Sequence, residues 1–263
     1  MGLNYETFRQ LADLSTRFRP KARSLMLGRQ KLRLGRRNIF GRIRHAAGYR
    51  AALKAARLSP NLADYMQPDG YSELAMKMLG FGSVETLDIS SFQGTCIVHD
   101  MNEPIPIELC GQFDFILDGG TLEHVFHVPL AMANVFKMLR PGGRFIGVNP
   151  LNGWPGHGFY QFSPELVFGF WKRGCGCRVH RCLALPVKRA WRPIHLADSQ
   201  EVGGRNLFGR KLDRRRADLY FEVEKTTDSR MHRKILQSDY VARWSSAPEQ
   251  DEDGRAPRSR LDT

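Results

Sequence analysis

The sequence lacks any long hydrophobic run. No stretch of about 18 consecutive apolar residues occurs, so no helix is expected to cross a membrane. The first ten residues, MGLNYETFRQ, contain no apolar core of a signal peptide, and Glu6 stands where a myristoylation signal requires Ser or Thr. Internal repeats are also absent. These absences predict a cytoplasmic protein without a transmembrane segment.

Cysteine is scarce, and its odd number argues against a disulfide framework. The five cysteines are Cys96, Cys110, Cys175, Cys177 and Cys182. An odd number without a secretion signal indicates a reducing compartment. Cys175, Cys177 and Cys182 lie close to His180, which raises the alternative of a zinc site. No second pair follows downstream as zinc-binding patterns require, so we predict no metal site.

Acidic residues are missing between positions 29 and 57, where ten basic residues occur. Apolar residues such as Leu32, Ile43 and Leu53 are interspersed, which favours helical cover over a free tail. The whole chain carries a net charge of +13, which suits anionic partners or peripheral contact with an anionic membrane. Nucleic acid is the less favoured partner because Phe40 and Tyr49 are the only aromatic residues there for base stacking.

The 263 residues suffice for one large core. We predict an N-terminal helix within 1–22, an α/β domain over 23–244 with a basic helical insertion at 31–70, and a disordered tail over 245–263. Strands are predicted at 24–28, 84–89, 95–98, 113–117, 144–148, 178–185 and 219–224, and helices at 4–18, 71–79, 128–139 and from 163 onward. Alternating strands and helices favour a mostly parallel sheet covered on both faces.

Polar or small residues stand at the ends of four predicted strands. Gly28, Asp88, Asp100 and Asp118 each fall at or just after such an end. Ligands of parallel sheets bind beyond the carboxyl ends of the strands, so these residues are expected to line one crevice.

A nucleoside cofactor with a sulfonium group matches these residue types. The Asp88 carboxylate can accept two hydrogen bonds from a ribose diol. Asp100 and Met101 offer adenine a polar contact and an apolar wall. Gly28 and Gly119 permit the close backbone approach that the amino-acid end of the cofactor needs.

Two segments resemble class I S-adenosylmethionine (SAM) dependent methyltransferases. Residues 113–125 read FDFILDGGTLEHV, similar to that family's fourth-strand motif, and residues 139–145 read LRPGGRF, similar to its turn into the fifth strand. The resemblance implies a Rossmann-like, mostly parallel seven-stranded sheet with helices on both faces, and SAM as cofactor. It also implies that Asp88 holds the ribose, that Asp100 and Met101 hold the adenine, and that Asp118 and Gly119 line the methionine end.

The first glycine loop departs from the family's pattern. Where an acidic residue and G-x-G are usual, this chain has Leu27, Gly28, Arg29 and Gln30. We expect Arg29 or Gln30 to meet the cofactor carboxylate through charge-assisted or amide hydrogen bonds. The alternative is a degenerate loop that no longer binds SAM. The insertion that follows is expected to form a lid over the carboxyl edge of the sheet.

Three residues are candidates for catalysis. His124 is placed to take a proton from the acceptor, although it could instead only hydrogen-bond its own loop. The segment 149–163 is rich in glycine, aromatic and polar residues, and its His157 and Tyr160 are expected to contact the acceptor. The alternative is a structural loop packed over the sheet edge.

Two functions from different classes follow. The first is a methyltransferase that moves a methyl group from SAM to an O or N acceptor, such as a sugar, a lipid-linked glycan or another small metabolite, with an anionic acceptor favoured by the charge. The second is a methyltransferase-like binding module without catalysis, whose basic segment holds nucleic acid or anionic lipid.

Overall fold

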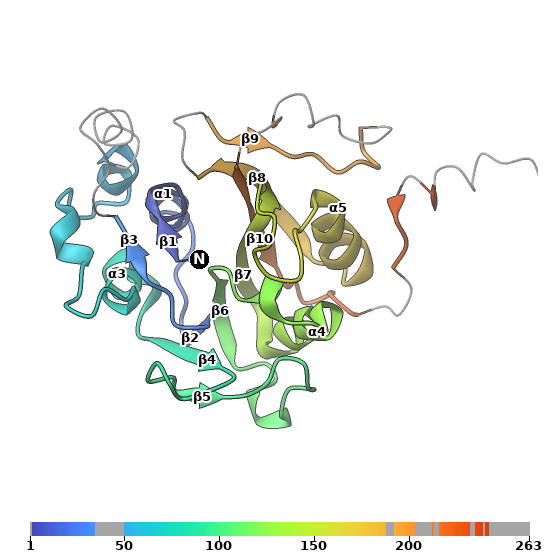
Figure 1. Ribbon diagram of the computed structural model, residues 1–263, viewed down its shortest axis with the longest axis horizontal. Helices are drawn as coiled ribbons and strands as arrows, with labels where there is room; N and C mark the ends of the chain where they lie inside the picture. Colours follow the sequence, from blue (N-terminus) through green and yellow to red (C-terminus); the bar gives the residue numbers. More distant parts are fainter. Residues whose placement is uncertain are drawn as a thin grey trace, which may run out of the picture.

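The computed structural model describes residues 2–34, 50–187, 192–202, 212, 216–231, 235–238 and 240–241. Its main feature is an eight-stranded sheet with the order β5-β4-β2-β6-β7-β10-β8-β9 (Figure 1). These strands are β5 (Ile97–Val98), β4 (Val84–Asp88), β2 (Arg23–Leu27), β6 (Phe113–Asp118), β7 (Leu139–Asn152), β10 (Ala217–Glu224), β8 (Arg178–Pro186) and β9 (Ile194–His195).

The sheet is mostly parallel, as expected for a Rossmann-like α/β fold. The first five strands in this order run parallel to their neighbours, and β10 is antiparallel to both β7 and β8. The expected fold class is therefore confirmed. The sheet has one strand more than the seven expected, because the two-residue strand β9 adds to the edge of β8. Short strands of this kind give no periodic signal in the sequence.

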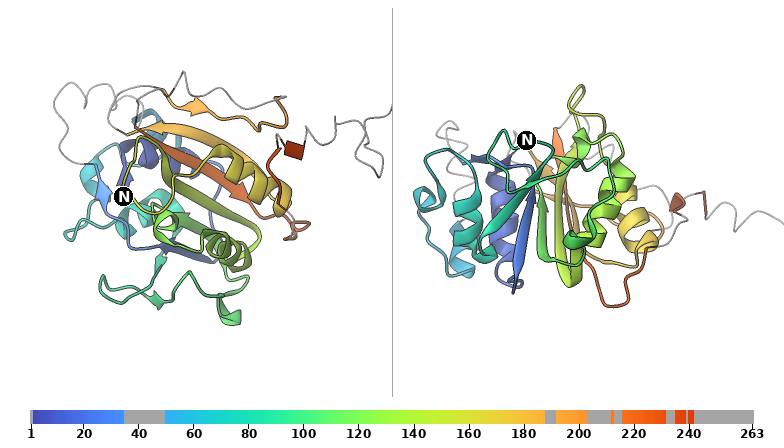
Figure 2. Two further views of the ribbon diagram at one scale, coloured as in Figure 1. Left: turned by 45° about the vertical axis from the view of Figure 1, so that its right-hand side comes forward. Right: turned by 90° about the horizontal axis from the view of Figure 1, so that it is seen from below.

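Helices cover both faces of the sheet (Figure 2). One face packs against α4 (Val128–Met138) and against α5 (Pro164–Leu166), which continues into the helical turn η5 (Val167–Gly174). The other face packs against α1 (Tyr5–Leu14) and against α3 (Glu73–Met76), which continues into η2 (Lys77–Phe81). Each face therefore has its own apolar core, and the sheet separates the two.

The N-terminal helix is part of the domain rather than an appendage. Asn4 caps α1 by accepting hydrogen bonds from the backbone amides of Glu6 and Thr7. Three apolar side chains of α1, those of Phe8, Leu11 and Leu14, are completely buried in the core cluster of this face. Spacing of three and four residues brings these side chains to one side of the helix, which explains why α1 seals this face of the sheet.

The described part of the basic segment packs on the same face as α1. A short strand, β3 (Leu32–Arg33), pairs with β1 (Leu3–Asn4) in a separate two-stranded sheet. Residues 50–55 are helical, and Leu53 is buried in the same cluster as Tyr65 of the turn η1 (Leu62–Tyr65). Leu53 and Tyr65 therefore cover this face of the sheet. The strands β1 and β3 lie next to its carboxyl edge, because the Gly2 amide donates to the Gly119 carbonyl just after β6 and the Leu3 amide donates to the Lys31 carbonyl. Residues 35–49 and the tail predicted at 245–263 lie outside the described residues.

The Pro-Gly-Gly turn at 141–143 is absorbed into β7. This strand spans Leu139–Asn152, and its pairing with β6 shifts register between Phe113 and Phe115. Gly142 has φ of 82°, and its amide donates to the Lys225 carbonyl, so the turn is a local irregularity in a longer strand. Among the described residues, no helix is both long and apolar enough to cross a bilayer.

Candidate functional site

The strand order places a ligand crevice between β2 and β6. From β2 the chain continues to β4 on one side, and from β6 it continues to β7 on the other, so the direction of winding changes between the two central strands. Ligands of open α/β sheets bind beyond the carboxyl ends of the strands at such a switch point. The residues that follow β2, β4, β5 and β6 therefore decide what this chain can bind.

A pocket of about 150 Å³ opens at these strand ends. Its lining consists of Leu27, Leu87, Asp88, Ile89, His99, Asp100, Met101, Asn102, Thr121, His124 and Val125. The structure thus brings together four of the residues that the sequence predicted, namely Asp88, Asp100, Met101 and His124. Two carboxylates at one end and apolar side chains along the walls form a site for a small molecule with polar groups at its edges.

The carboxylates of Asp88 and Asp100 come from neighbouring strands. Asp88 ends β4, and its Oδ1 accepts a hydrogen bond from the Ile89 amide at 2.7 Å. Asp100 follows β5, and its Oδ1 accepts from the Asn102 amide and side chain, both at 2.8 Å. These hydrogen bonds from Asn102 lower the pKa of Asp100, because they stabilise the charged form. The pocket therefore presents an ionised carboxylate held in a fixed orientation.

Gln30 fills the space between the two glycines expected at the methionine end. Its side-chain amide donates to the Leu27 carbonyl at 3.0 Å and to the Thr121 hydroxyl at 3.2 Å. A Cβ built on Gly119 would lie 2.9 Å from Gln30 Cδ, and one built on Gly28 would lie 3.3 Å from Gln30 Nε2. Gly28, Gln30 and Gly119 therefore lie together, and the amide of Gln30, expected to meet the cofactor carboxylate, is bound within the protein.

Arg29 has a different role from the one expected. Its guanidinium pairs with Asp69 at 2.7 Å and with Glu73 at 2.5 Å. It also lies over the ring of Tyr71, 3.9 Å from the centroid. Hydrogen bonding to Glu73 raises its pKa further. Arg29 lies outside the pocket lining and connects the first loop to the start of α3. Its partner Glu73 is more than forty positions away in the sequence, so local sequence patterns do not predict this contact.

Asp118 is buried beneath the site. Its Oδ1 accepts from the amides of Gly120 and Thr121, and its Oδ2 accepts from Asn149 Nδ2 at 2.6 Å. Burial raises the pKa of Asp118 to about 7, and repulsion from Glu123 adds to this effect. The carboxylate therefore holds the turn after β6 in place. Neither Asp118 nor Gly119 lines the pocket.

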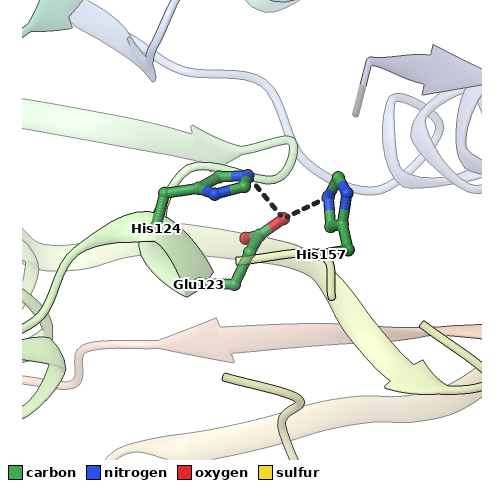
Figure 3. A group of neighbouring side chains, drawn as sticks. All are labelled: Glu123, His124 and His157. Atoms are coloured by element: carbon green, nitrogen blue, oxygen red, sulfur yellow. Dashed lines mark ion pairs between the residues drawn. The ribbon is translucent and has the colours of Figure 1, made fainter. Parts of the chain in front are cut away.

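Glu123, His124 and His157 form a cluster beside the pocket (Figure 3). Glu123 and His124 belong to the turn η4 (Leu122–His124), and His157 comes from the loop after β7. Glu123 Oε1 lies 3.8 Å from His124 Nε2 and 3.6 Å from His157 Nε2. Burial lowers the pKa of both histidines and raises that of Glu123. The structure therefore places His157 beside His124, with ring centroids 5.0 Å apart.

Tyr160 anchors the loop rather than pointing into the pocket. Its hydroxyl donates to the Phe126 carbonyl at 2.7 Å, and the Phe159 and Tyr160 amides both donate to the Glu123 carbonyl. Phe126 and Phe159 themselves are exposed, and their rings meet edge to face at 5.5 Å. An aromatic surface thus flanks the histidines.

Sequence reasoning missed Glu123, Thr121 and Asn149 as members of the site. Thr121 donates its hydroxyl to the Leu27 carbonyl at 2.8 Å, and Asn149 Nδ2 lies between Asp118 and Glu123. The available signal was the position of Thr121 and Glu123 within the quoted motif at 113–125. Asn149 is the first residue of the segment 149–163, but its contacts with Asp118 and Glu123 had no local signal, because they depend on the pairing of β6 with β7.

The cysteine-rich segment shows no donors arranged for a metal. Cys175, Cys177 and Cys182 are buried free thiols, and His180 hydrogen-bonds Glu224 at 2.7 Å. Burial raises the pKa of Cys175 to about 12 and that of Cys177 to about 11, which opposes the thiolate that a metal requires. These thiols pack as apolar side chains in the core.

Comparisons with known proteins return similarity in structure only. No family model and no curated protein matches the chain. A complex of the Trm112 methyltransferase activator from Haloferax volcanii contains a chain with 14% identity and a TM-score of 0.46, covering 84% of this chain and 89% of that one. The trans-methyltransferase CalH with SAH has 16% identity and a TM-score of 0.39, covering 84% of this chain and 58% of that one. A Burkholderia thailandensis 1,6-didemethyltoxoflavin-N1-methyltransferase has 16% identity and a TM-score of 0.35, covering 58% and 66%. The fold assignment rests on the strand order of this chain itself.

Proposed function

We propose that this protein is a SAM-dependent methyltransferase that acts on an O or N acceptor. The observation that carries the proposal is the pocket at the switch point, where the carboxylates of Asp88 and Asp100 meet an apolar wall. This residue set fits an adenosine group, since Asp88 can accept from the ribose hydroxyls while Asp100 and Met101 meet the adenine. SAM would supply the methyl group from its sulfonium, which would leave as a neutral thioether.

The protein's part in the reaction is mainly orientation. Methyl transfer is an in-line displacement, so the acceptor atom must approach the methyl group closely and on the correct side. His124 lines the pocket and lies beside His157, so an acceptor held by these side chains is next to the cofactor site. Because burial lowers the pKa of His124, its imidazole is neutral at pH 7 and can accept a proton from the acceptor hydroxyl or amine.

The surface beside the histidines supports an acceptor with an apolar part. Phe126 and Phe159 are 60% and 64% exposed. Together with the net charge of +13, they suit an acceptor that joins a polar, anionic group to an apolar one, as a lipid-linked glycan does. A sugar or another small metabolite would use the histidines alone.

A binding module without catalysis is the second candidate. It is favoured by the filled space at the first loop, where Gln30 lies between Gly28 and Gly119 and the Gly2 amide donates to the Gly119 carbonyl at 3.3 Å. In that case the protein would not bind SAM, and its basic residues would hold anionic lipid or nucleic acid.

Titration calorimetry with SAM separates the two candidates. The proposal expects saturable binding by the wild-type protein and a loss of about 2 kcal/mol for Asp88→Ala, the scale of a lost hydrogen bond to a charged group. Glu108→Gln is the matched control, because Glu108 is an exposed carboxylate of the turn η3 (Ile107–Leu109) outside the pocket. Absence of SAM binding by folded wild-type protein would favour the binding module. Equal SAM affinity of Asp88→Ala and the wild-type protein would show that Asp88 does not bind the cofactor.

A further inference from the structure

We propose that Glu123, His124 and His157 bind a divalent transition-metal ion. Glu123 Oε1 lies 3.6 Å from His157 Nε2 and 3.8 Å from His124 Nε2, and one ligand atom from each of the three residues lies within 4.8 Å of the others (Figure 3). No other group of three such side chains meets this condition among the described residues. This inference departs from the sequence analysis, which predicted no metal site.

Two of the three donor atoms are buried without a hydrogen-bond partner. Glu123 Oε1 and His157 Nε2 both belong to this class, and the Glu123 side chain is fully buried. A distance of 3.6 Å is too long for a hydrogen bond between them. Leaving buried polar atoms without partners is costly, and both atoms point to the same place. A cation between them would satisfy both at once.

The surrounding structure fixes the donors. Glu123 Oε2 accepts from Asn149 Nδ2 at 3.0 Å, which leaves Oε1 to point at the histidines. The carbonyl of Glu123 accepts from the amides of Phe159 and Tyr160, so the loop that carries His157 is bound to the turn that carries Glu123. Gly158 permits this approach, since a Cβ there would lie 2.8 Å from the Glu123 carbonyl oxygen. Hydrogen bonds behind the ligands are typical of protein metal sites.

The donor set indicates the kind of metal. Two imidazole nitrogens and one carboxylate oxygen suit zinc and its first-row neighbours. Bond lengths near 2.1 Å place tetrahedral ligand atoms about 3.4 Å apart. The distances of 3.6 and 3.8 Å from Glu123 Oε1 are close to this value, and the two histidine donors, which lie within 4.8 Å of each other, would approach on binding. Three protein ligands leave at least one position open, which is the pattern of catalytic rather than structural sites.

The open position would face the acceptor, and this part of the inference rests on the proposed function. His124 lines the pocket that would hold the cofactor, and its side chain is 47% exposed. A metal bound there would coordinate an acceptor oxygen and lower the pKa of its hydroxyl. His124 would then act as a ligand, and the metal would replace it in activating the acceptor.

Metal titration of the EDTA-treated protein tests the site without SAM. We expect the wild-type chain to bind one Co²⁺ with a visible absorption change, and Zn²⁺ to displace it. His157→Ala and Glu123→Gln should each weaken Co²⁺ binding at least a hundredfold. His127→Ala is the matched control, because His127 is exposed, three residues from His124 and outside the cluster; it should leave binding unchanged.

Three results would overturn the inference: no saturable Co²⁺ binding by folded wild-type protein, equal binding by His157→Ala, or equal loss in His127→Ala. Circular dichroism identifies a variant that fails to fold, and His157→Ala, on a partly exposed loop, keeps the test open if the buried Glu123→Gln does not fold. A parallel SAM titration in EDTA distinguishes failure of one proposal from failure of the other. Metal binding without SAM binding would refute the proposed function alone. SAM binding without metal binding would refute the metal site alone.

Discussion

Replacing Gln30 with Ala should tighten SAM binding about tenfold. The Gln30 side chain fills the space between Gly28 and Gly119, where the proposed function places the amino-acid end of the cofactor. To free that space, Gln30 must give up its hydrogen bonds to the Leu27 carbonyl and the Thr121 hydroxyl. Two neutral hydrogen bonds contribute roughly 1–3 kcal/mol net, and about 1.4 kcal/mol corresponds to tenfold in affinity.

The substitution itself should be tolerated. The Leu27 carbonyl still accepts from the Thr121 hydroxyl at 2.8 Å, so no buried acceptor is left without a partner. We expect the free energy of unfolding to fall by about 1 kcal/mol, the scale of the lost hydrogen bonds. Calorimetric titration with SAM, combined with urea unfolding, measures both quantities on the same preparation.

Gln112→Ala is the matched control. Gln112 also donates its amide to a carbonyl, that of Cys110 at 3.2 Å, but it lies at the amino-terminal end of β6, opposite the pocket. Its loss should leave SAM affinity unchanged. A tenfold weaker affinity in Gln30→Ala would show that Gln30 is a cofactor ligand, as the sequence analysis expected, and an unchanged affinity would show that the cofactor does not use this space.

Three further predictions concern the buried Asp218 and the loop after β7 that carries Gly156, Gly158 and Tyr160. Burial raises the pKa of Asp218 to about 7. Between about pH 4 and 7 the folded state therefore binds more protons than the unfolded state, and the free energy of unfolding falls as the pH rises through this window. Asp218→Asn should therefore raise the free energy of unfolding at pH 8 by up to about 4 kcal/mol, and urea unfolding at pH 8 that shows no gain would contradict this. Gly158→Ala should lower the melting temperature more than Gly156→Ala. Both glycines have positive φ, but only at Gly158 would a Cβ meet backbone, at 2.8 Å from the Glu123 carbonyl oxygen. Equal melting temperatures would be inconsistent with this close approach. Tyr160→Phe removes the hydrogen bond to the Phe126 carbonyl and should slow methyl transfer severalfold at unchanged SAM affinity. A loss of SAM binding in the folded variant would instead place Tyr160 in the cofactor site.

The pattern of strand ends was predictable because it depends on short stretches of sequence. Asp88 ends the strand read from the run VETLD, and Asp100 and Met101 follow the next predicted strand. All three residues were therefore expected at the carboxyl edge before any contact was known. Parallel strands necessarily bring their ends to one edge of the sheet. This side of the pocket is therefore encoded locally, strand by strand.

The behaviour of the first loop was not predictable in the same way. Arg29 and Gln30 are adjacent in sequence, yet one points to Asp69 and Glu73 and the other packs between Gly28 and Gly119. Which residue faces the crevice is decided by partners some forty to ninety positions away. A sequence pattern names the residue types in a loop, but long-range pairing decides their direction.

The histidine cluster shows how the two kinds of information combine. Glu123 and His124 come from a recognisable motif, while His157 comes from a loop that follows β7, and the two segments meet because β6 and β7 are paired and Asn149 joins Asp118 to Glu123. A buried carboxylate next to a second buried carboxylate would be strongly unfavourable unless hydrogen bonds or a cation offset the charge. Asn149 provides the hydrogen bonds for one oxygen of each acid, and the remaining oxygen of Glu123 faces two neutral imidazoles. The same arrangement that stabilises the acid pair therefore leaves Oε1 of Glu123 directed at His124 and His157, which is where the proposed metal ion would complete the charge balance.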